Sequence, residues 1–212
     1  MGAQLRAVRQ RIRAIQSTAK ITRAQELIAS SRIIQAQQRV RASAPYAAEL
    51  TRAVEAVVSR SAQIDHPLVR EPASTERVAM LILTSDRGFA GGYNANVLRE
   101  AQRLRALLEE DRGVAVQTFV SGTKGITWHR FRDRDLAGEW RGFSERPAPA
   151  NATAIASVVL EAFEQPAAEG GVDEIYCVFT EFVSMLTQRS VVRRILPIEI
   201  KESPEPPPAG GR

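Results

Sequence analysis

The chain is poor in the residues on which most redox and catalytic sites depend. Its 212 residues include one cysteine, Cys177, and two histidines, His66 and His129. A single cysteine excludes an intrachain disulfide or a paired-cysteine redox motif and favours a reducing compartment. The histidines have no cysteine or ligand-spaced carboxylate beside them, so we expect neither a metal site nor a catalytic triad.

Long apolar runs are also missing. No stretch approaches the roughly 20 residues that a membrane-spanning helix needs, and the arginine-rich N-terminus lacks the apolar segment of a secretion signal. We therefore expect no direct membrane insertion. The composition, 44% hydrophobic and 25% charged, is that of a folded protein rather than a disordered one.

The N-terminal part has no helix-breaking residues for a long distance. Residues 3–44 contain no glycine or proline, and Glu26 is their only acidic residue against nine basic ones. This stretch predicts a basic helix of roughly 60 Å, at 1.5 Å per residue. Pro45 either ends the helix or bends it, and the helical spacing of Leu50 and Val54 favours a bent continuation to residue 60.

Apolar residues form a narrow stripe on this helix. They recur at intervals of three and four residues, the spacing of a coiled-coil interface, and we call four of them the seam: Leu5, Val8, Ile12 and Ile15. Residues 1–45 contain no aromatic residue, whereas helices that bind nucleic acid or membranes commonly present aromatic or bulky apolar groups. The pattern therefore favours a partner helix, although a basic coiled-coil adaptor for nucleic acid stays an alternative.

Beyond an expected linker at residues 61–76, short apolar runs alternate with amphipathic segments. The pattern predicts strands at 78–83, 114–120 and 175–180, helices at 94–110, 123–131 and 151–163, and a possible edge strand at 191–200. This alternation predicts a mainly parallel, three-layer α/β domain of Rossmann-like type over residues 77–201. The proline-rich segment 202–212 is predicted to be disordered.

One loop of this domain looks like a possible binding site. Residues 85–94, SDRGFAGGYN, lie between a predicted strand and a helix, where backbone amides could hold a phosphate. The glycine spacing matches neither a dinucleotide-binding fingerprint nor a P-loop, and the second strand is not followed by an acidic residue for a ribose. We interpret the loop as a structural turn in which Asp86 and Asn94 cap the helix, and we expect Thr123 to cap the next one. A nucleotide-binding domain stays the other alternative.

Several blocks of the sequence resemble the gamma subunit of F-type ATP synthases. They are MGAQL at 1–5, QSTAKITRAQELIASSR at 16–32, APY at 44–46 and the loop at 85–94, and the resemblance runs to about residue 201. It implies a central rotor shaft whose N-terminal helix winds antiparallel against a C-terminal helix inside a ring of alternating alpha and beta subunits. It also implies that the α/β domain contacts the epsilon subunit and the membrane rotor ring. These residues do not include a match to that C-terminal helix.

The resemblance further implies a non-catalytic subunit that couples ring rotation at the membrane to ATP synthesis or hydrolysis. We expect no catalytic site, cofactor or nucleic acid, and a peripheral location on the cytoplasmic face of the cell membrane. Gln25 departs from the methionine common at this position in the family. Contacts with the ring are expected from Arg9, Arg13, Lys20, Arg23, Gln25 and Arg32. A contact with a neighbouring subunit is expected from the loop residues Asp86, Arg87, Gly88, Gly91 and Gly92.

Overall fold

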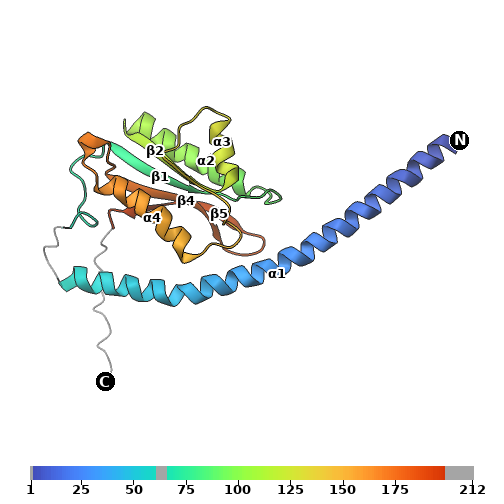
Figure 1. The fold of residues 1–212 in the computed structure, drawn as a ribbon, viewed down its shortest axis with the longest axis horizontal. Helices are drawn as coiled ribbons and strands as arrows, with labels where there is room; N and C mark the ends of the chain where they lie inside the picture. The colour runs from blue at the N-terminus through green and yellow to red at the C-terminus, as the bar shows by residue number, and fades with distance from the viewer. Residues whose placement is uncertain (1, 61–65, 199–212) are drawn as a thin grey trace, which may run out of the picture. The chain divides into compact units, whose positions relative to one another are not determined.

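The computed structural model describes residues 2–60 and 66–198, and the chain divides into two compact units, Met1–Ala62 and Gln63–Arg212. The first unit is a single helix, α1 (Gly2–Arg60), drawn in blue to cyan in Figure 1. The second is an α/β unit. The predicted tail at 202–212 lies outside the described residues, as do positions 61–65 of the predicted linker.

Helix α1 continues through Pro45, which lies inside it. Proline removes one backbone donor and leaves the carbonyl of Arg41 without its helical partner. Arg41 and Pro45 are both exposed, so water can satisfy that carbonyl. The helix curves along its length without a break (Figure 1), so the expectation of continuation rather than termination is confirmed.

The α/β unit is built on a five-stranded sheet in the order β3-β2-β1-β4-β5. The strands are β1 (Arg77–Leu83), β2 (Ala115–Ser121), β3 (Gly138–Trp140), β4 (Glu174–Phe182) and β5 (Gln188–Leu196). The first four in the sheet order run parallel, and β5 pairs antiparallel with β4 at one edge. The mainly parallel sheet and its edge strand are confirmed. Strand β3 was not expected, because three residues of intermediate burial carry no apolar run.

Helices cover both faces of the sheet. Helices α2 (Tyr93–Ala106) and α3 (Thr123–Arg130) lie on one face, and α4 (Pro149–Glu164) lies on the other (Figure 1). A π-helical turn, η1 (Leu107–Asp111), extends α2, and a 3-10 turn, η2 (Ala167–Glu169), follows α4. Alternate residues of β1 serve the two faces, since Met80 and Ile82 pack towards α2 and α3 while Ala79 packs towards α4. The three-layer α/β fold is confirmed.

The described end of the predicted linker packs onto the α/β unit. Leu68 packs against the core beneath α4, and its carbonyl accepts a hydrogen bond of 2.7 Å from the amide of Ile198. Glu71 binds Arg194 of β5 through two contacts of 2.9 and 2.6 Å. Residues 66–76 are therefore irregular in conformation but are held by specific contacts.

Candidate functional site

The seam of α1 is open to solvent. Its four side chains, Leu5, Val8, Ile12 and Ile15, are 49–62% exposed, although each is apolar and each lies on one stripe. A stripe of this kind is stabilised only when a second helix packs along it, because an isolated helix gains little from its own propensity. The geometry is therefore that of one half of a coiled coil.

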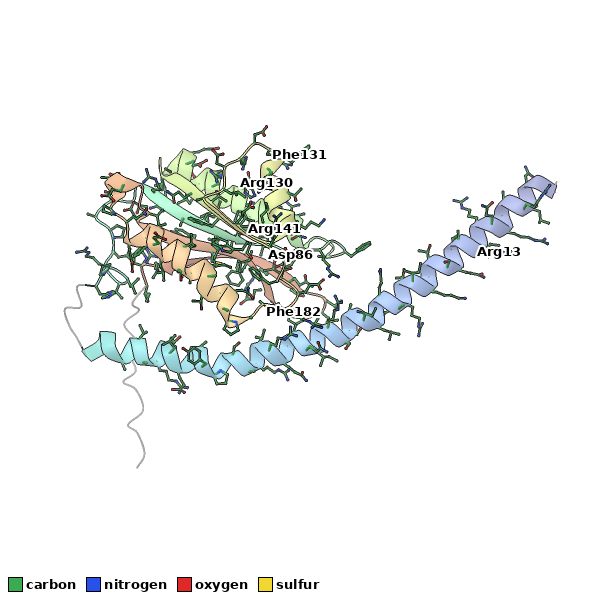
Figure 2. The ribbon with its side chains drawn as sticks, viewed as in Figure 1. Arg13, Asp86, Arg130, Phe131, Arg141 and Phe182 are labelled. Atoms are coloured by element: carbon green, nitrogen blue, oxygen red, sulfur yellow. The ribbon has the colours of Figure 1, made fainter. Side chains whose placement is uncertain are left out.

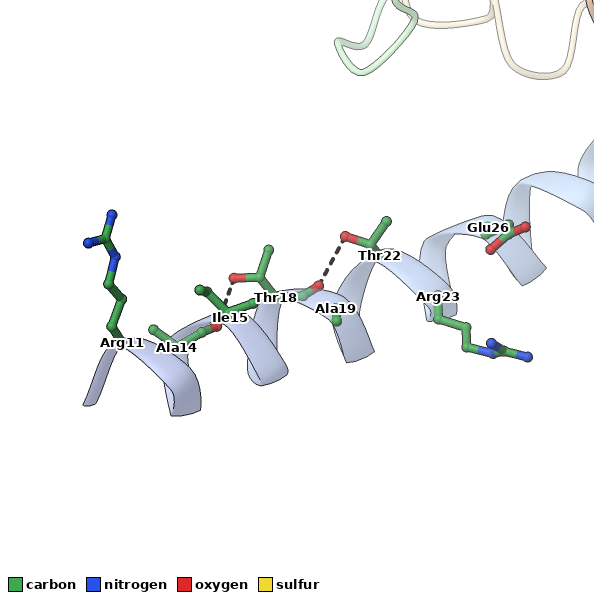
Figure 3. A pocket seen from close by; sticks show the side chains of 8 residues that line it. All are labelled: Arg11, Ala14, Ile15, Thr18, Ala19, Thr22, Arg23 and Glu26. Atoms are coloured by element: carbon green, nitrogen blue, oxygen red, sulfur yellow. Dashed lines mark hydrogen bonds between the residues drawn. The ribbon is translucent and has the colours of Figure 1, made fainter. Parts of the chain in front are cut away.

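A shallow groove continues the seam towards the middle of α1 (Figure 3). Its floor is made of small side chains, among them Thr18 and Thr22, and Arg11, Arg23 and Glu26 stand around it. Thr18 donates its hydroxyl to the carbonyl of Ala14, and Thr22 donates to that of Thr18, each at 3.0 Å. Because both hydroxyls are turned back to the backbone, the groove presents methyl groups to a partner.

The residues expected to face a surrounding ring are all exposed. Figure 2 shows Arg13 projecting from α1, and the others on the helix are exposed as well: Arg9, Lys20, Arg23, Gln25 and Arg32. The cations Arg9, Arg13, Lys20 and Arg23 are spaced four, seven and three residues apart, so they lie along one side of the helix, whereas Arg32 lies on another. This row of cations gives the helix a basic face that can meet an acidic surface.

In the α/β unit, Asp86 ties three loops together at the carboxyl ends of the parallel strands. Its Oδ1 accepts from the amide and the hydroxyl of Thr123, at 3.0 and 2.8 Å, where α3 begins. Its Oδ2 accepts from the amide of Ser144 at 2.9 Å, and its own amide donates to the Ser144 hydroxyl at 2.8 Å. Asp86 thus joins the loop after β1 to the start of α3 and to the loop after β3.

These donors determine the charge of Asp86. Partial burial opposes ionisation, but hydrogen bonds from the backbone at Gly142 and Ser144 and from both donors of Thr123 outweigh it, and together they hold the pKa of the carboxyl well below its ordinary value. Asp86 is therefore ionised at neutral pH and lies at the positive end of α3. The position in which a phosphate would sit at this helix terminus is occupied by the chain's own carboxylate. This arrangement disfavours the nucleotide-binding alternative at this helix.

Two glycines near the start of α3 allow this packing. Gly122 has φ of +106°, and a Cβ there would lie 2.3 Å from the carbonyl oxygen of Thr84. A Cβ at Gly125 would lie 2.7 Å from both the Thr84 hydroxyl and Val120. Thr84 is buried, and its Oγ1 accepts from the Gly125 amide at 3.0 Å. The close approach of α3 to the end of β1 requires both glycines.

Three details of the predicted turn are wrong. Asp86 and Asn94 do not cap α2, whose N-cap position is Gly92 without a side-chain bond. Asn94 instead lies within the helix and accepts from the amide of Ser85 at 2.9 Å. Thr123 does not cap α3 either, because it is the first helical residue and its hydroxyl donates to Asp86. The capping partner came from a loop 37 residues earlier, which local sequence rules cannot identify.

The outer surface of the same loop is exposed. Arg87, Gly88, Gly91 and Gly92 are all exposed, Gly91 has φ of +53°, and Arg87 binds Glu145 at 3.0 Å. The intervening Phe89 is fully exposed. The β4–β5 turn adds further exposed apolar side chains, which begin with Phe182, labelled in Figure 2, and continue with Val183, Met185 and Leu186. Exposed apolar side chains of this kind are typical of protein contacts.

The remaining candidate groups are structural. Burial raises the pKa of the Cys177 thiol to about 11, against a smaller opposing effect of Arg193, so the thiol is not a nucleophile at neutral pH. His129 is fully buried and its Nδ1 bonds the carbonyl of Gly125 at 2.9 Å. Within residues 2–60 and 66–198, no group of three potential metal ligands occurs. No helix among these residues is long and apolar enough to cross a membrane.

Comparison with known proteins gives one consistent result. A family model described as ATP synthase matches residues 4–210. The chain is 55% identical over 210 residues to the ATP synthase gamma chain of Acidothermus cellulolyticus, covering 99% of this chain and 69% of that protein. It is 54% identical over 202 residues to the gamma chain of Thermobifida fusca, covering 95% of this chain and 66% of the relative.

Among solved structures, a chain from the central stalk and c-ring of the Tetrahymena thermophila mitochondrial ATP synthase shows a TM-score of 0.45 at 20% identity. It covers 65% of this chain and 61% of its own length. A chain of the Euglena gracilis mitochondrial ATP synthase shows a TM-score of 0.42 at 15% identity, and the match covers 57% of this chain and 36% of that chain. These similarities are weaker than those to the bacterial sequences, of which the chain spans about two thirds.

Proposed function

The chain belongs to the gamma subunit family of F-type ATP synthases, and on that premise we propose that it acts as the central rotor shaft of such an enzyme. The observation that carries the proposal is the identity of 55% over nearly the whole chain to an ATP synthase gamma chain. The exposed seam and the basic surface of α1 support it, because a shaft needs a partner helix on one stripe and a mobile contact with its surroundings elsewhere.

In this role α1 turns inside a ring of alpha and beta subunits. Exposed arginines and lysines form ion pairs worth only about 0–1 kcal/mol each, so contacts between a basic shaft and acidic loops can break and re-form as the shaft turns. Turning then biases the catalytic subunits towards conformations of different nucleotide affinity, which is a population shift imposed mechanically. The gamma chain itself supplies no catalytic group in this scheme.

The α/β unit supplies the contacts with the rest of the rotor. We propose that the exposed loop surface at Arg87, Gly88, Gly91 and Gly92 meets the epsilon subunit or the membrane rotor ring, whereas Asp86 faces inward and holds the loop in shape. The support is the difference in exposure within a single loop, together with the apolar side chain of Phe89 beside it. The protein would then lie at the cytoplasmic face of the membrane without entering it.

Co-expression of the complete polypeptide with the alpha and beta subunits of the same genome tests the shaft role. We expect the chain to be retained on a tagged beta subunit through gel filtration, and the purified complex to hydrolyse ATP. Ile12→Asp, which places a charge on the seam, should reduce retention. Ala7→Asp, an exposed position off the seam, is the matched control and should be retained. Absence of the wild-type chain from the ring complex would overturn the proposal.

A further inference from the structure

The apolar register of α1 extends far beyond the seam. Alternate steps of three and four residues lead from Leu5 through Ile15 and continue without a shift to Val54. From Ile33 onward, every position reached in this way is Ile, Val, Leu, Ala or Ser. A heptad repeat sustained over this length specifies a left-handed supercoil along one continuous stripe, rather than a short local contact.

The middle of this stripe has a different composition. The positions there are Ala19, Thr22, Glu26 and Ala29, so the helix is narrow at the groove shown in Figure 3 and then presents a carboxylate. Small residues let a second helix approach closely and let its larger side chains fill the groove. Glu26 lies at the end of that groove, in line with the seam.

The charge of Glu26 is uncompensated among the described residues. Its carboxylate takes part in no hydrogen bond or ion pair within residues 2–60 and 66–198, whereas Glu49 of the same helix binds Arg52 at 2.6 Å away from the stripe. A helix laid along the register would exclude water from Glu26. Burying a carboxylate without a partner is costly, and pairing with a cation reduces that cost.

A second copy of α1 does not supply such a cation from its own stripe. None of the positions in the register from Leu5 to Val54 is Lys or Arg. Parallel, in-register pairing would place Glu26 against Glu26, and no antiparallel pairing of the two stripes puts a basic residue opposite it. The composition of the stripe therefore favours a different helix as the occupant.

We propose that the helix covering α1 carries a lysine or arginine at the level of Glu26, flanked by large apolar residues that fill the groove between Ala19 and Thr22. The other positions of the stripe are apolar or small, so the pair formed by Glu26 and the partner's cation fixes the register of the two helices. The inference rests on the proposed shaft role, and it adds the chemistry that the partner must have. A single polar position is an established means of fixing coiled-coil register.

The test uses the assembled complex of the full chain with the alpha and beta subunits. Glu26→Gln, Glu26→Leu and Glu26→Lys are compared with the same three changes at Glu49, which is exposed and lies off the stripe. The measurement is the rate at which the chain leaves the complex. We expect Glu26→Leu and Glu26→Lys to leave at least about tenfold faster than wild type, because each strands a buried cation. Changes at Glu49 should stay within about twofold.

Photo-cross-linking from a benzoylphenylalanine at position 30, one helical turn beyond Glu26, identifies the covering segment. A cross-link to a helix with a Lys or Arg within one turn supports the proposal, and so does restored retention when that residue and Glu26 are exchanged. A covering segment without a basic residue there overturns it, as does Glu26→Leu that is retained as long as wild type. In both of those cases the complex has assembled, so the shaft role stands. If the wild-type chain does not assemble with the alpha and beta subunits, both the shaft role and the proposal about the covering helix are overturned.

Discussion

The side chain of Asp86 connects its own loop to two other loops of the α/β unit. It accepts from Thr123 and Ser144, and its loop is held to the start of α3 by the amide of Lys124, which donates to the carbonyl of Ser85 at 3.0 Å. The exposed part of the loop, around Arg87 and Phe89, is therefore displayed on a rigid base. Rigidity matters for a subunit contact, since an ordered loop loses less conformational entropy on binding.

We expect Asp86→Ala to lower the free energy of unfolding of the α/β unit by on the order of 2–4 kcal/mol, because charge-assisted hydrogen bonds to Thr123 and Ser144 are lost and their donors are left unsatisfied. Urea unfolding followed by tryptophan fluorescence measures this, since both tryptophans, Trp128 and Trp140, belong to this unit. Asp135→Ala, at an exposed position, is the control and should change stability by less than about 0.5 kcal/mol. Equal stabilities for the two variants would contradict the role given to Asp86.

Acid should weaken the α/β unit in two steps. Burial lowers the pKa of His129 below its ordinary 6.5, with Arg105, Arg134 and Arg132 acting in the same direction against the bond to Gly125. The unfolded chain then binds a proton that the folded chain does not, so stability falls as pH drops below about 6.5. The pKa of Asp86 is also depressed, so its contribution is present above about pH 4 and is lost below it.

The same fluorescence assay, repeated from pH 7.5 to pH 3, checks this dependence. His129→Asn should be less stable at every pH and should show a flatter slope between pH 6.5 and pH 5, while it keeps the fall below pH 4. A variant with an unchanged slope would show that His129 is not the group that titrates there.

For individual residues, the sequence predicts local turns more readily than it predicts hydrogen-bond partners that are distant along the chain. The position of the loop between a strand and a helix was predictable from the apolar run before it and from its glycines, whereas the capping roles predicted for Asp86 and Asn94 were wrong. The bond from Asp86 to Thr123 was not predictable, because it spans 37 residues and depends on how β1 and β2 pair. Gly122 and Gly125 were missed for the same reason, since the atoms that exclude a side chain there belong to Thr84.

Among the elements, α1 shows what propensity and pattern determine without tertiary contacts. Its continuity and its seam followed from the absence of glycine over 42 positions and from the spacing of Leu5, Val8, Ile12 and Ile15. Strand β3 shows the opposite case, since Gly138–Trp140 pairs with Phe119–Ser121 through the backbone and has no apolar run of its own. A short edge strand depends on its neighbour, which sequence periodicity does not report.

In the isolated chain, we expect α1 to be much less stable than the α/β unit, because its seam is about half exposed and gains no packing energy. Hydrogen exchange at low protein concentration should show amides of residues 5–40 exchanging far faster than those of β1. Helical circular dichroism should fall at a lower temperature than tryptophan fluorescence changes. Self-association at high concentration is the expected exception, and full protection of residues 3–44 in a dilute monomer would contradict the prediction.

At the scale of the whole molecule, charge is divided unequally between the two units. Residues 1–60 carry 11 basic and 3 acidic side chains, out of 29 and 24 in the chain, so the α/β part is slightly acidic. The net positive charge of the chain thus lies on the helix that we assign to the ring. Charge contacts between exposed groups depend weakly on geometry and are screened by salt. These properties suit a surface that must meet the same ring in several orientations.

If the shaft's cations act collectively, single replacements should have small effects on ATP synthesis by the assembled enzyme. Replacing Arg9, Arg13, Lys20, Arg23 or Arg32 with alanine removes one exposed contact worth about 0–1 kcal/mol, which corresponds to less than about a fivefold change in rate. Replacing Arg9, Lys20 and Arg32 together should have an effect near the sum of the three single ones, because these positions are at least 11 residues apart on the helix and act independently. The effect should also shrink as salt is raised. The rate of ATP synthesis driven by an imposed proton gradient measures the single effects, the combined effect and their dependence on salt. Retention of the chain in the complex is the control for assembly. Complete loss of synthesis from one of these replacements, in a complex that retains the chain, would indicate a specific interlock between that residue and the ring instead of a shared basic surface.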